Sequence, residues 1–139
     1  MDYPDDLLRD VLNRVRSVAV VGASPNPARP SHSVSRYLLS QGYRVLPVNP
    51  GQAGRSMFGT RVAADLADLP EAPDMIDIFR RSEHAGAVVD QALDLFPDLI
   101  AIWMQLGVRD PAAAKRAEAR GVIVIQDRCP AIERPRLFR

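Results

Sequence analysis

The sequence predicts an α/β fold: a Rossmann-like, doubly wound parallel sheet of about five strands. Short apolar runs rich in β-branched residues alternate with helical patterns along the chain, which is typical of βαβ units. The first run ends in glycine and leads through a polar loop into a helix. Because crossovers are right-handed, we expect the strand order 3-2-1-4-5, numbered along the chain. The expected strands are residues 17–22, 43–48, 75–79, 99–104 and 122–125.

The helices are predicted from apolar residues three and four positions apart and from signals at their ends. Asp110 and Ser82 are suited to cap helix N-termini, and Gly42 and Gly121 follow the last turns of two helices. Pro47 lacks an N–H, so the second strand cannot be paired along its full length on both sides. We expect helices at residues 5–15, 31–41, 82–95 and 110–120, an irregular stretch at 51–73 with a helical turn within 62–69, and a last turn within 130–139.

Composition narrows the class of protein. The 139 residues fit one domain spanning 1–139, and a net charge of +1 offers no basic field for nucleic acid. One cysteine and two histidines argue against a zinc site and a disulfide framework. The first residues lack the features of a secretory signal, and no apolar stretch approaches the length of a membrane span. We therefore expect a cytoplasmic protein with no membrane partner.

In such folds ligands bind beyond the carboxyl ends of the strands. Residues 22–31 follow the first strand, and the helix N-terminus they lead into suits a phosphate, to which Arg29 could donate a charge-assisted hydrogen bond. The loop has only the first glycine of the dinucleotide fingerprint and lacks the ending of a Walker P-loop. The second strand ends at the neutral Asn49, with no acidic residue between Gly42 and Arg61, which counts against NAD. Arg44, Arg55 and Arg61 could instead suit an extra phosphate on the ribose.

The remaining strand ends carry further candidates. Arg80 and Arg81 follow the third strand directly, where two guanidinium groups before a helix start attract anions. His84 is expected to be a surface or cap residue rather than a base. Cys129 follows the fifth strand, and we expect a buried structural thiol there because no base is evident nearby. Trp103 is expected in the core.

Five segments of the sequence together resemble CoA-binding proteins. These proteins are related to the nucleotide-binding domain of the succinyl-CoA synthetase α subunit and of ADP-forming acyl-CoA synthetases. The likeness to stand-alone bacterial members runs from about Ser17 to the end of the chain. The segments that carry it are residues 20–31, 42–50, 77–81, 103–107 and 127–130.

The resemblance implies that coenzyme A lies across the strand ends. Asn49 and Pro50 would touch the adenosine end, and Phe79, Arg80 and Arg81 would border the adenine or the phosphates. The turn of Gln105, Leu106 and Gly107 would meet the pantetheine arm. The first loop would hold the pyrophosphate or the 3′-phosphate through Gly22, Ala23, Ser24 and Arg29, with Asn26 and Ser31 completing the expected site.

One departure from the synthetases limits what the resemblance implies. The synthetases add a phosphorylated histidine on a following domain and an ATP-grasp partner, and the sequence contains neither. We therefore expect binding of CoA or an acyl-CoA without catalysis by this chain alone. Three alternatives stay open: an NAD(P)-binding oxidoreductase or redox sensor, a synthetase subunit that needs an ATP-grasp partner, and a domain that has lost its ligand. A homodimer is a further possibility, and a mixed disulfide between Cys129 and the CoA thiol is a hypothesis resting on one residue.

Overall fold

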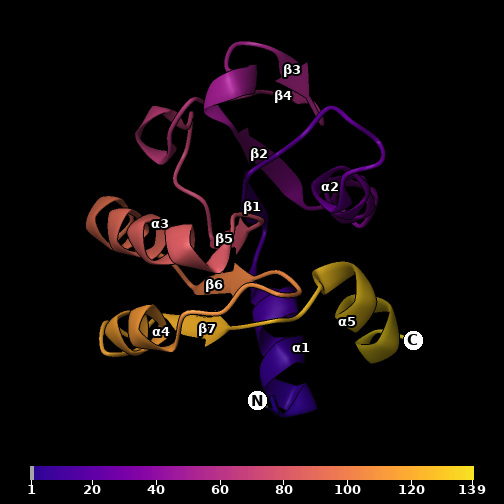
Figure 1. Cartoon of the computed structure of the whole chain (residues 1–139). Coiled ribbons are helices and arrows are strands. Elements are labelled where there is room, and N and C mark those ends of the chain that lie inside the picture. The colour runs from indigo at the N-terminus through magenta and orange to yellow at the C-terminus, as the bar shows by residue number, and fades with distance from the viewer. Residues whose placement is uncertain (1) are drawn as a thin grey trace.

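Five parallel strands form the central sheet of the protein (Figure 1). The structure, a computed structural model, describes residues 2–139. The sheet confirms the predicted α/β, Rossmann-like fold and the number of strands. The strands are β1 (Ser17–Val21), β2 (Arg44–Val48), β5 (Met75–Ile78), β6 (Ala101–Met104) and β7 (Ile123–Ile125).

The predicted strand order is wrong. The sheet runs β2-β1-β5-β6-β7, so the third predicted strand lies beside the first and not beside the second. Pro47 gives the physical reason why β2 lies at the edge. Its carbonyl accepts a hydrogen bond from the N–H of Ala63 at 3.0 Å, on the side of β2 away from β1. The missing N–H of Pro47 lies on that same outer side, so it removes no hydrogen bond between β2 and β1. A single parallel bridge between Val48 and Ala63 takes the place of a full strand there.

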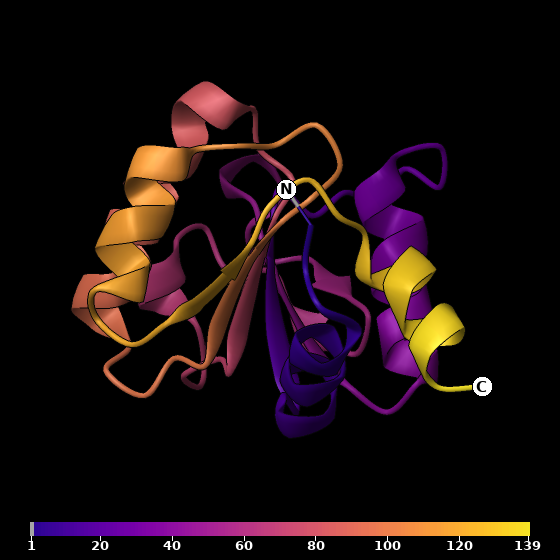
Figure 2. The same cartoon turned by 90° about the horizontal axis from the view of Figure 1, so that it is seen from below.

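Helices cover both faces of the sheet (Figures 1 and 2). On one face, Leu8, Leu38 and Leu137 from three helices join Trp103 of the sheet in one apolar cluster. On the other face, Ile76 belongs to a second cluster with apolar residues of the other two helices. The first layer holds α1 (Asp5–Arg14), α2 (Pro30–Ser40) and α5 (Pro130–Leu137), and the second holds α3 (Ser82–Leu95) and α4 (Pro111–Glu118).

The ends of two helices test the predicted caps. Asp110 caps α4, since its side chain accepts a hydrogen bond from the N–H of Ala113 at 3.0 Å. Ser82 does not cap α3, because Arg81 occupies the N-cap position. The Ser82 hydroxyl instead bonds the loop after β6, which matters for the site below.

The stretch between β2 and β5 is more ordered than expected. It contains a hairpin whose two central residues, Phe58 and Gly59, both have positive φ (55° and 80°), as a tight primed turn requires. The predicted helical turn within 62–69 is present, and α5 runs longer than the single expected turn. Among residues 2–139, no helix combines the length and apolar character needed to cross a membrane. The predicted turn is η2 (Leu66–Asp68), and the elements that were not predicted are η1 (Pro50–Gln52), β3 (Ser56–Met57) and β4 (Thr60–Arg61).

Candidate functional site

The loop after β1 is fixed to the end of β2 by hydrogen bonds. The N–H of Gly22 donates to the carbonyl of Val48 at 2.9 Å, and the side-chain amide of Asn49 donates to the carbonyl of Ala23 at 2.7 Å. The helix after β1 covers one face of the sheet and the helix after β5 covers the other. Such a switch point opens a crevice for ligands at the carboxyl ends of the strands.

Gly22 lies at the centre of this crevice. Its φ is +96°, and a Cβ at this position would lie 3.3 Å from the Cβ of Phe79, which follows β5. Two hollows meet at Gly22 and Asn49, and both are open to solvent. We call them the β2–α3 hollow and the α2–β6 hollow after the elements beside them.

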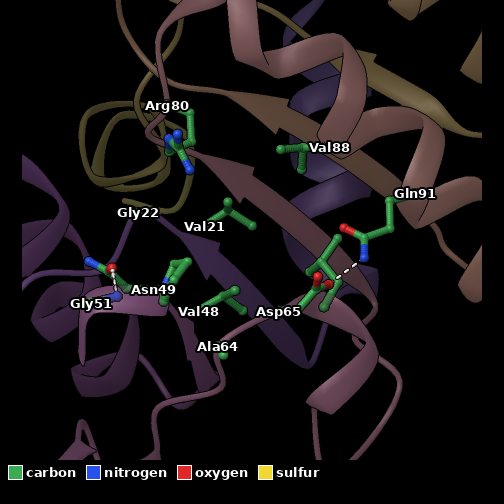
Figure 3. Close-up of a pocket in the computed structure, with 12 residues that line it drawn as sticks. Val21, Gly22, Val48, Asn49, Gly51, Ala64, Asp65, Arg80, Val88 and Gln91 are labelled. Carbon is green, nitrogen blue, oxygen red and sulfur yellow. Dashed lines mark hydrogen bonds between the residues drawn. The ribbon is translucent and has the colours of Figure 1, made fainter. Parts of the chain in front are cut away.

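The β2–α3 hollow has a volume of about 450 Å³ and an apolar floor (Figure 3). Polar groups stand around this floor. The carboxylate of Asp65 accepts hydrogen bonds from the side-chain amide of Gln91 and from the N–H of Ala67, and Arg80 lies beside Gly22. An apolar floor with polar groups at its margin suits a planar base. The lining is Val21, Gly22, Val48, Asn49, Pro50, Gly51, Ala64, Asp65, Leu66, Arg80, Val88 and Gln91.

The α2–β6 hollow has a volume of about 490 Å³ and includes the N-terminus of α2. Arg29 is the N-cap residue and makes no side-chain cap bond, and the first turn of α2 contains no acidic residue. The helix dipole and the Arg29 guanidinium therefore both favour an anion at this end of the hollow. The lining is Gly22, Ser24, Arg29, Pro30, Ser31, Asn49, Phe79, Gln105, Leu106 and Val108, and none of these residues is acidic.

Gln105 contributes a buried amide to the α2–β6 hollow. The residue is only 6% exposed, and its Oε1 has no hydrogen-bond partner within the described chain. An unpaired buried acceptor is destabilising until a donor reaches it. The side chain is therefore a candidate contact for a ligand N–H.

Ten of the fourteen residues expected in the site line one hollow or the other. Four do not. Ala23 is fully buried behind the loop, and Asn26 bonds within it, accepting from the N–H of Ala28. Arg81 points into solvent beside Glu83, and Gly107 donates its N–H to Asp127.

Several lining residues were not predicted from the sequence. Val88 and Gln91 lie three positions apart on α3, and only the folded sheet shows that this face borders the first loop. Asp65 follows the acid-free stretch between Gly42 and Arg61, so the β2–α3 hollow does contain a carboxylate that could meet a ribose. A helical 3.6-residue pattern on α3 was the only signal that could have found Val88.

The other candidates take structural positions. Cys129 is buried among apolar residues, as expected for a structural thiol. Trp103 is fully buried and donates its indole N–H to the carbonyl of Arg128. His84 is half exposed at the start of α3 and lines neither hollow. No group of three or more metal-ligating side chains is found in the described part of the chain.

Several known proteins are similar to this chain in sequence and fold. A relative from Bacillus subtilis (strain 168), the uncharacterized protein YneT, is 32% identical over 122 residues, covering 88% of this chain and 87% of the relative. A structure from Thermus thermophilus is 40% identical with a TM-score of 0.91, covering 98% of this chain and all (100%) of that one. A hypothetical protein from Pyrococcus horikoshii OT3 is 31% identical with a TM-score of 0.89, covering 99% of this chain and 94% of that one.

A larger enzyme contains a similar region. The dinucleotide forming acetyl-coenzyme A synthetase 1 of Ca. Korarchaeum cryptofilum, solved with phosphate and ADP, is 25% identical with a TM-score of 0.62. The match covers 87% of this chain and 27% of the synthetase chain. The family described as a CoA binding domain matches residues 16–135 of the sequence. The chain therefore belongs to the CoA binding domain family.

Proposed function

We propose that this protein binds coenzyme A or an acyl-CoA across the carboxyl ends of β1, β2, β5 and β6. The observation that carries the proposal is the pair of hollows that meet at Gly22 and Asn49. Coenzyme A has two chemically different halves, a phosphorylated adenosine and a pantetheine arm, joined by a pyrophosphate. Two joined hollows with anion-attracting groups near their junction match that division.

Each half of the ligand has a matching hollow. The adenine would lie on the apolar floor of the β2–α3 hollow, and the pyrophosphate would lie over Gly22, where no side chain intervenes. Arg29 and Arg80 border the junction from opposite sides and would neutralise the phosphates. The pantetheine arm would then extend along the α2–β6 hollow toward Gln105.

We propose binding and not catalysis. The residues lining the two hollows include no cysteine, histidine or lysine, and their single carboxylate, Asp65, already accepts two hydrogen bonds. Two serine hydroxyls, of Ser24 and Ser31, line the α2–β6 hollow, and the Ser24 hydroxyl accepts from the N–H of Asn26 rather than bonding to a base. A nucleophile with a base in contact is what acyl transfer would need. Similarity to part of a synthetase keeps one alternative open, that this chain completes an acyl-CoA synthetase together with an ATP-grasp partner.

Asp65 supports a second candidate function, NAD(P) binding. A carboxylate in the β2–α3 hollow could accept hydrogen bonds from ribose hydroxyls, as acidic residues do in dinucleotide-binding domains. The existing bonds of Asp65 to Gln91 and Ala67 compete with that role. The loop after β1 also lacks the second and third glycines of the fingerprint.

Calorimetric titration with CoA, dephospho-CoA and NAD tests the proposal. We expect saturable CoA binding, weaker binding of dephospho-CoA, and no binding of NAD. Arg29→Gln and Arg80→Gln should each weaken CoA binding by about tenfold or more, because each removes a charge-assisted hydrogen bond. Arg36→Gln is the matched control, since Arg36 is an exposed arginine of α2 that lines neither hollow.

Other outcomes would favour the alternatives. NAD binding without CoA binding would assign the protein to the dinucleotide-binding class. An ATP-grasp protein that copurifies and confers acyl-CoA synthesis would make this chain a synthetase subunit. A protein that binds none of the three ligands would contradict the proposal.

A further inference from the structure

The turn after β6, residues 105–108, forms one wall of the α2–β6 hollow. It closes with a hydrogen bond from the N–H of Val108 to the carbonyl of Gln105 at 2.8 Å. Gly107 supplies the positive φ of +83° that the turn requires. Leu106 is 54% exposed at the margin of the hollow, where its apolar side chain is free to contact a ligand.

Asp127, in the loop after β7, holds this turn from one side. One carboxylate oxygen accepts a hydrogen bond from the N–H of Gly107 at 2.7 Å, and the other accepts from the guanidinium of Arg109. The N–H of Asp127 donates to the carbonyl of Val108 at 3.2 Å. Three hydrogen bonds therefore link Asp127 to the turn and the residue that follows it.

Ser82, at the start of α3, holds the turn from the other side. Its hydroxyl donates to the carbonyl of Gly107 at 3.3 Å and accepts from the N–H of Arg109 at 2.9 Å. Both main-chain polar groups of Gly107 thus bond to side chains, the N–H to Asp127 in the loop after β7 and the carbonyl to Ser82 at the start of α3. A turn fixed in this way presents its other residues in one orientation.

The conformation of Asp127 itself is unusual. Its φ is +57°, and it is one of two non-glycine residues in the described chain with positive φ. The hydrogen bond from Gly107, followed by that from Arg109, lowers the pKa of the Asp127 carboxyl, so the group is ionised at neutral pH. A strained backbone with a charged side chain aimed at a turn indicates that the position of the turn is important.

The fixed turn carries Gln105 into the hollow. The N–H of Gln105 bonds to the carbonyl of Ile78, which places its side chain beside the end of β5. The buried carboxamide has an unpaired oxygen. The pantetheine arm contains two secondary amides, whose N–H groups are the donors that a carboxamide oxygen lacks, and alkyl groups that suit Leu106.

We propose that Asp127 is a positioning residue, which holds the 105–108 turn so that Gln105 and Leu106 bind the amide-bearing arm of the ligand. The inference rests on the proposed CoA binding and assigns the two halves of the ligand to different parts of the site. The first loop and the β2–α3 hollow hold the nucleotide half, and the turn anchored by Asp127 adds affinity only for ligands that have the arm.

The test compares two ligands in Asp127 variants. Adenosine 3′,5′-bisphosphate contains the nucleotide half of CoA and lacks the arm. Asp127→Gly keeps the left-handed backbone and removes the carboxylate, so it should weaken CoA binding by about tenfold while leaving the bisphosphate within about twofold of wild type. Asp127→Asn keeps an acceptor for Gly107 and tolerates the backbone, so it should restore part of the CoA affinity.

Two further variants sharpen the test. Gln105→Leu should reproduce the selective loss of CoA affinity. Combined with Asp127→Gly it should add little to that loss, because both changes remove the same contact with the ligand. Glu71→Gln breaks a carboxylate–arginine pair with Arg44, at the amino end of β2, and serves as a control with no expected change for either ligand. Retained bisphosphate binding shows that each variant is folded.

Each outcome has a distinct meaning. Wild-type binding of CoA with equal losses for both ligands in Asp127→Gly, or with no loss, would overturn this inference alone. Wild-type protein that binds neither ligand would overturn the proposed function and this inference with it. A selective loss of CoA affinity, partly restored by asparagine, is the result that supports it.

Discussion

Asp77 is the most unusual ionisable residue in the protein. It lies on β5, between Val20 of β1 and Trp103 of β6, and is fully buried. Neither carboxylate oxygen has a hydrogen-bond partner within residues 2–139. Burial raises the pKa of the Asp77 carboxyl well above its ordinary value, because desolvation disfavours the charged form.

This burial predicts a pH-dependent stability. The unfolded chain releases the Asp77 proton near pH 4, whereas the folded chain keeps it, so stability falls as pH rises from there toward the raised pKa. Urea unfolding between about pH 4 and pH 8 should show the free energy of unfolding of wild type falling relative to Asp77→Asn. The limiting slope is about 1.4 kcal/mol per pH unit. Asp94→Asn, on the exposed surface of α3, is the control and should follow wild type. Parallel profiles for wild type and Asp77→Asn would show that Asp77 is ionised when folded.

Gly22 combines a conformational and a steric requirement. Gly22→Ala should cost about 1–2 kcal/mol for the left-handed backbone, and its methyl group would also press on Phe79 at 3.3 Å. The matched control is Gly121→Ala, whose φ is +83° but whose Cβ would meet nothing within 4 Å. We expect both variants to lose stability in urea unfolding and only Gly22→Ala to weaken CoA binding in calorimetry. Equal CoA affinity in the two variants would place the phosphates away from Gly22.

At the scale of elements, the caps carry a separate prediction. Asp110→Ala removes the side chain that accepts from the N–H of Ala113 and should lower the free energy of unfolding by about 1 kcal/mol. Asp110→Asn should stay close to wild type, because an amide oxygen caps as well. Urea denaturation measures both. A wild-type midpoint for Asp110→Ala would mean that Pro111 at the first helical position suffices to start α4.

Elements defined by local signals could be predicted, and those defined by distant pairing could not. The helix predicted at residues 82–95 has those bounds in the structure, because its apolar periodicity and its ends are local. The right-handed crossover rule permits more than one strand order. The choice depends on which strand β5 meets after the 26 residues, 49–74, that separate it from β2. Pro47 indicated that the second strand could not be paired along its full length on both sides, which conflicted with its interior place in the expected order. The β3–β4 hairpin escaped prediction because Phe58 stands where asparagine or aspartate is usual.

At the scale of the whole molecule, the site depends on loops brought together by the sheet. The general rule that ligands lie at the carboxyl ends of the strands located most of the expected lining. It could not find Gln91, which enters from the middle of α3. It does include Asp127, two residues after β7, but not the hydrogen bond by which Asp127 holds the neighbouring turn. Such contacts depend on how helices and loops pack across the sheet, and this packing cannot be predicted from the local residue pattern of any one element.

Because the site joins loops from β1, β2, β5 and β6, a ligand that fills both hollows should stabilise the fold as a unit. At a CoA concentration one hundred times its dissociation constant, linkage adds about 2.7 kcal/mol to the free energy of unfolding. For a domain of this size that gain raises Tm by roughly 10 °C. Thermal melts over a range of CoA concentrations should follow the affinity measured by calorimetry. Adenosine 3′,5′-bisphosphate should give a smaller rise at equal concentration, since it leaves the α2–β6 hollow empty. Heat of binding without a matching rise in Tm would show that CoA binds the unfolded chain as well, and would argue against a site formed only when the strand ends come together.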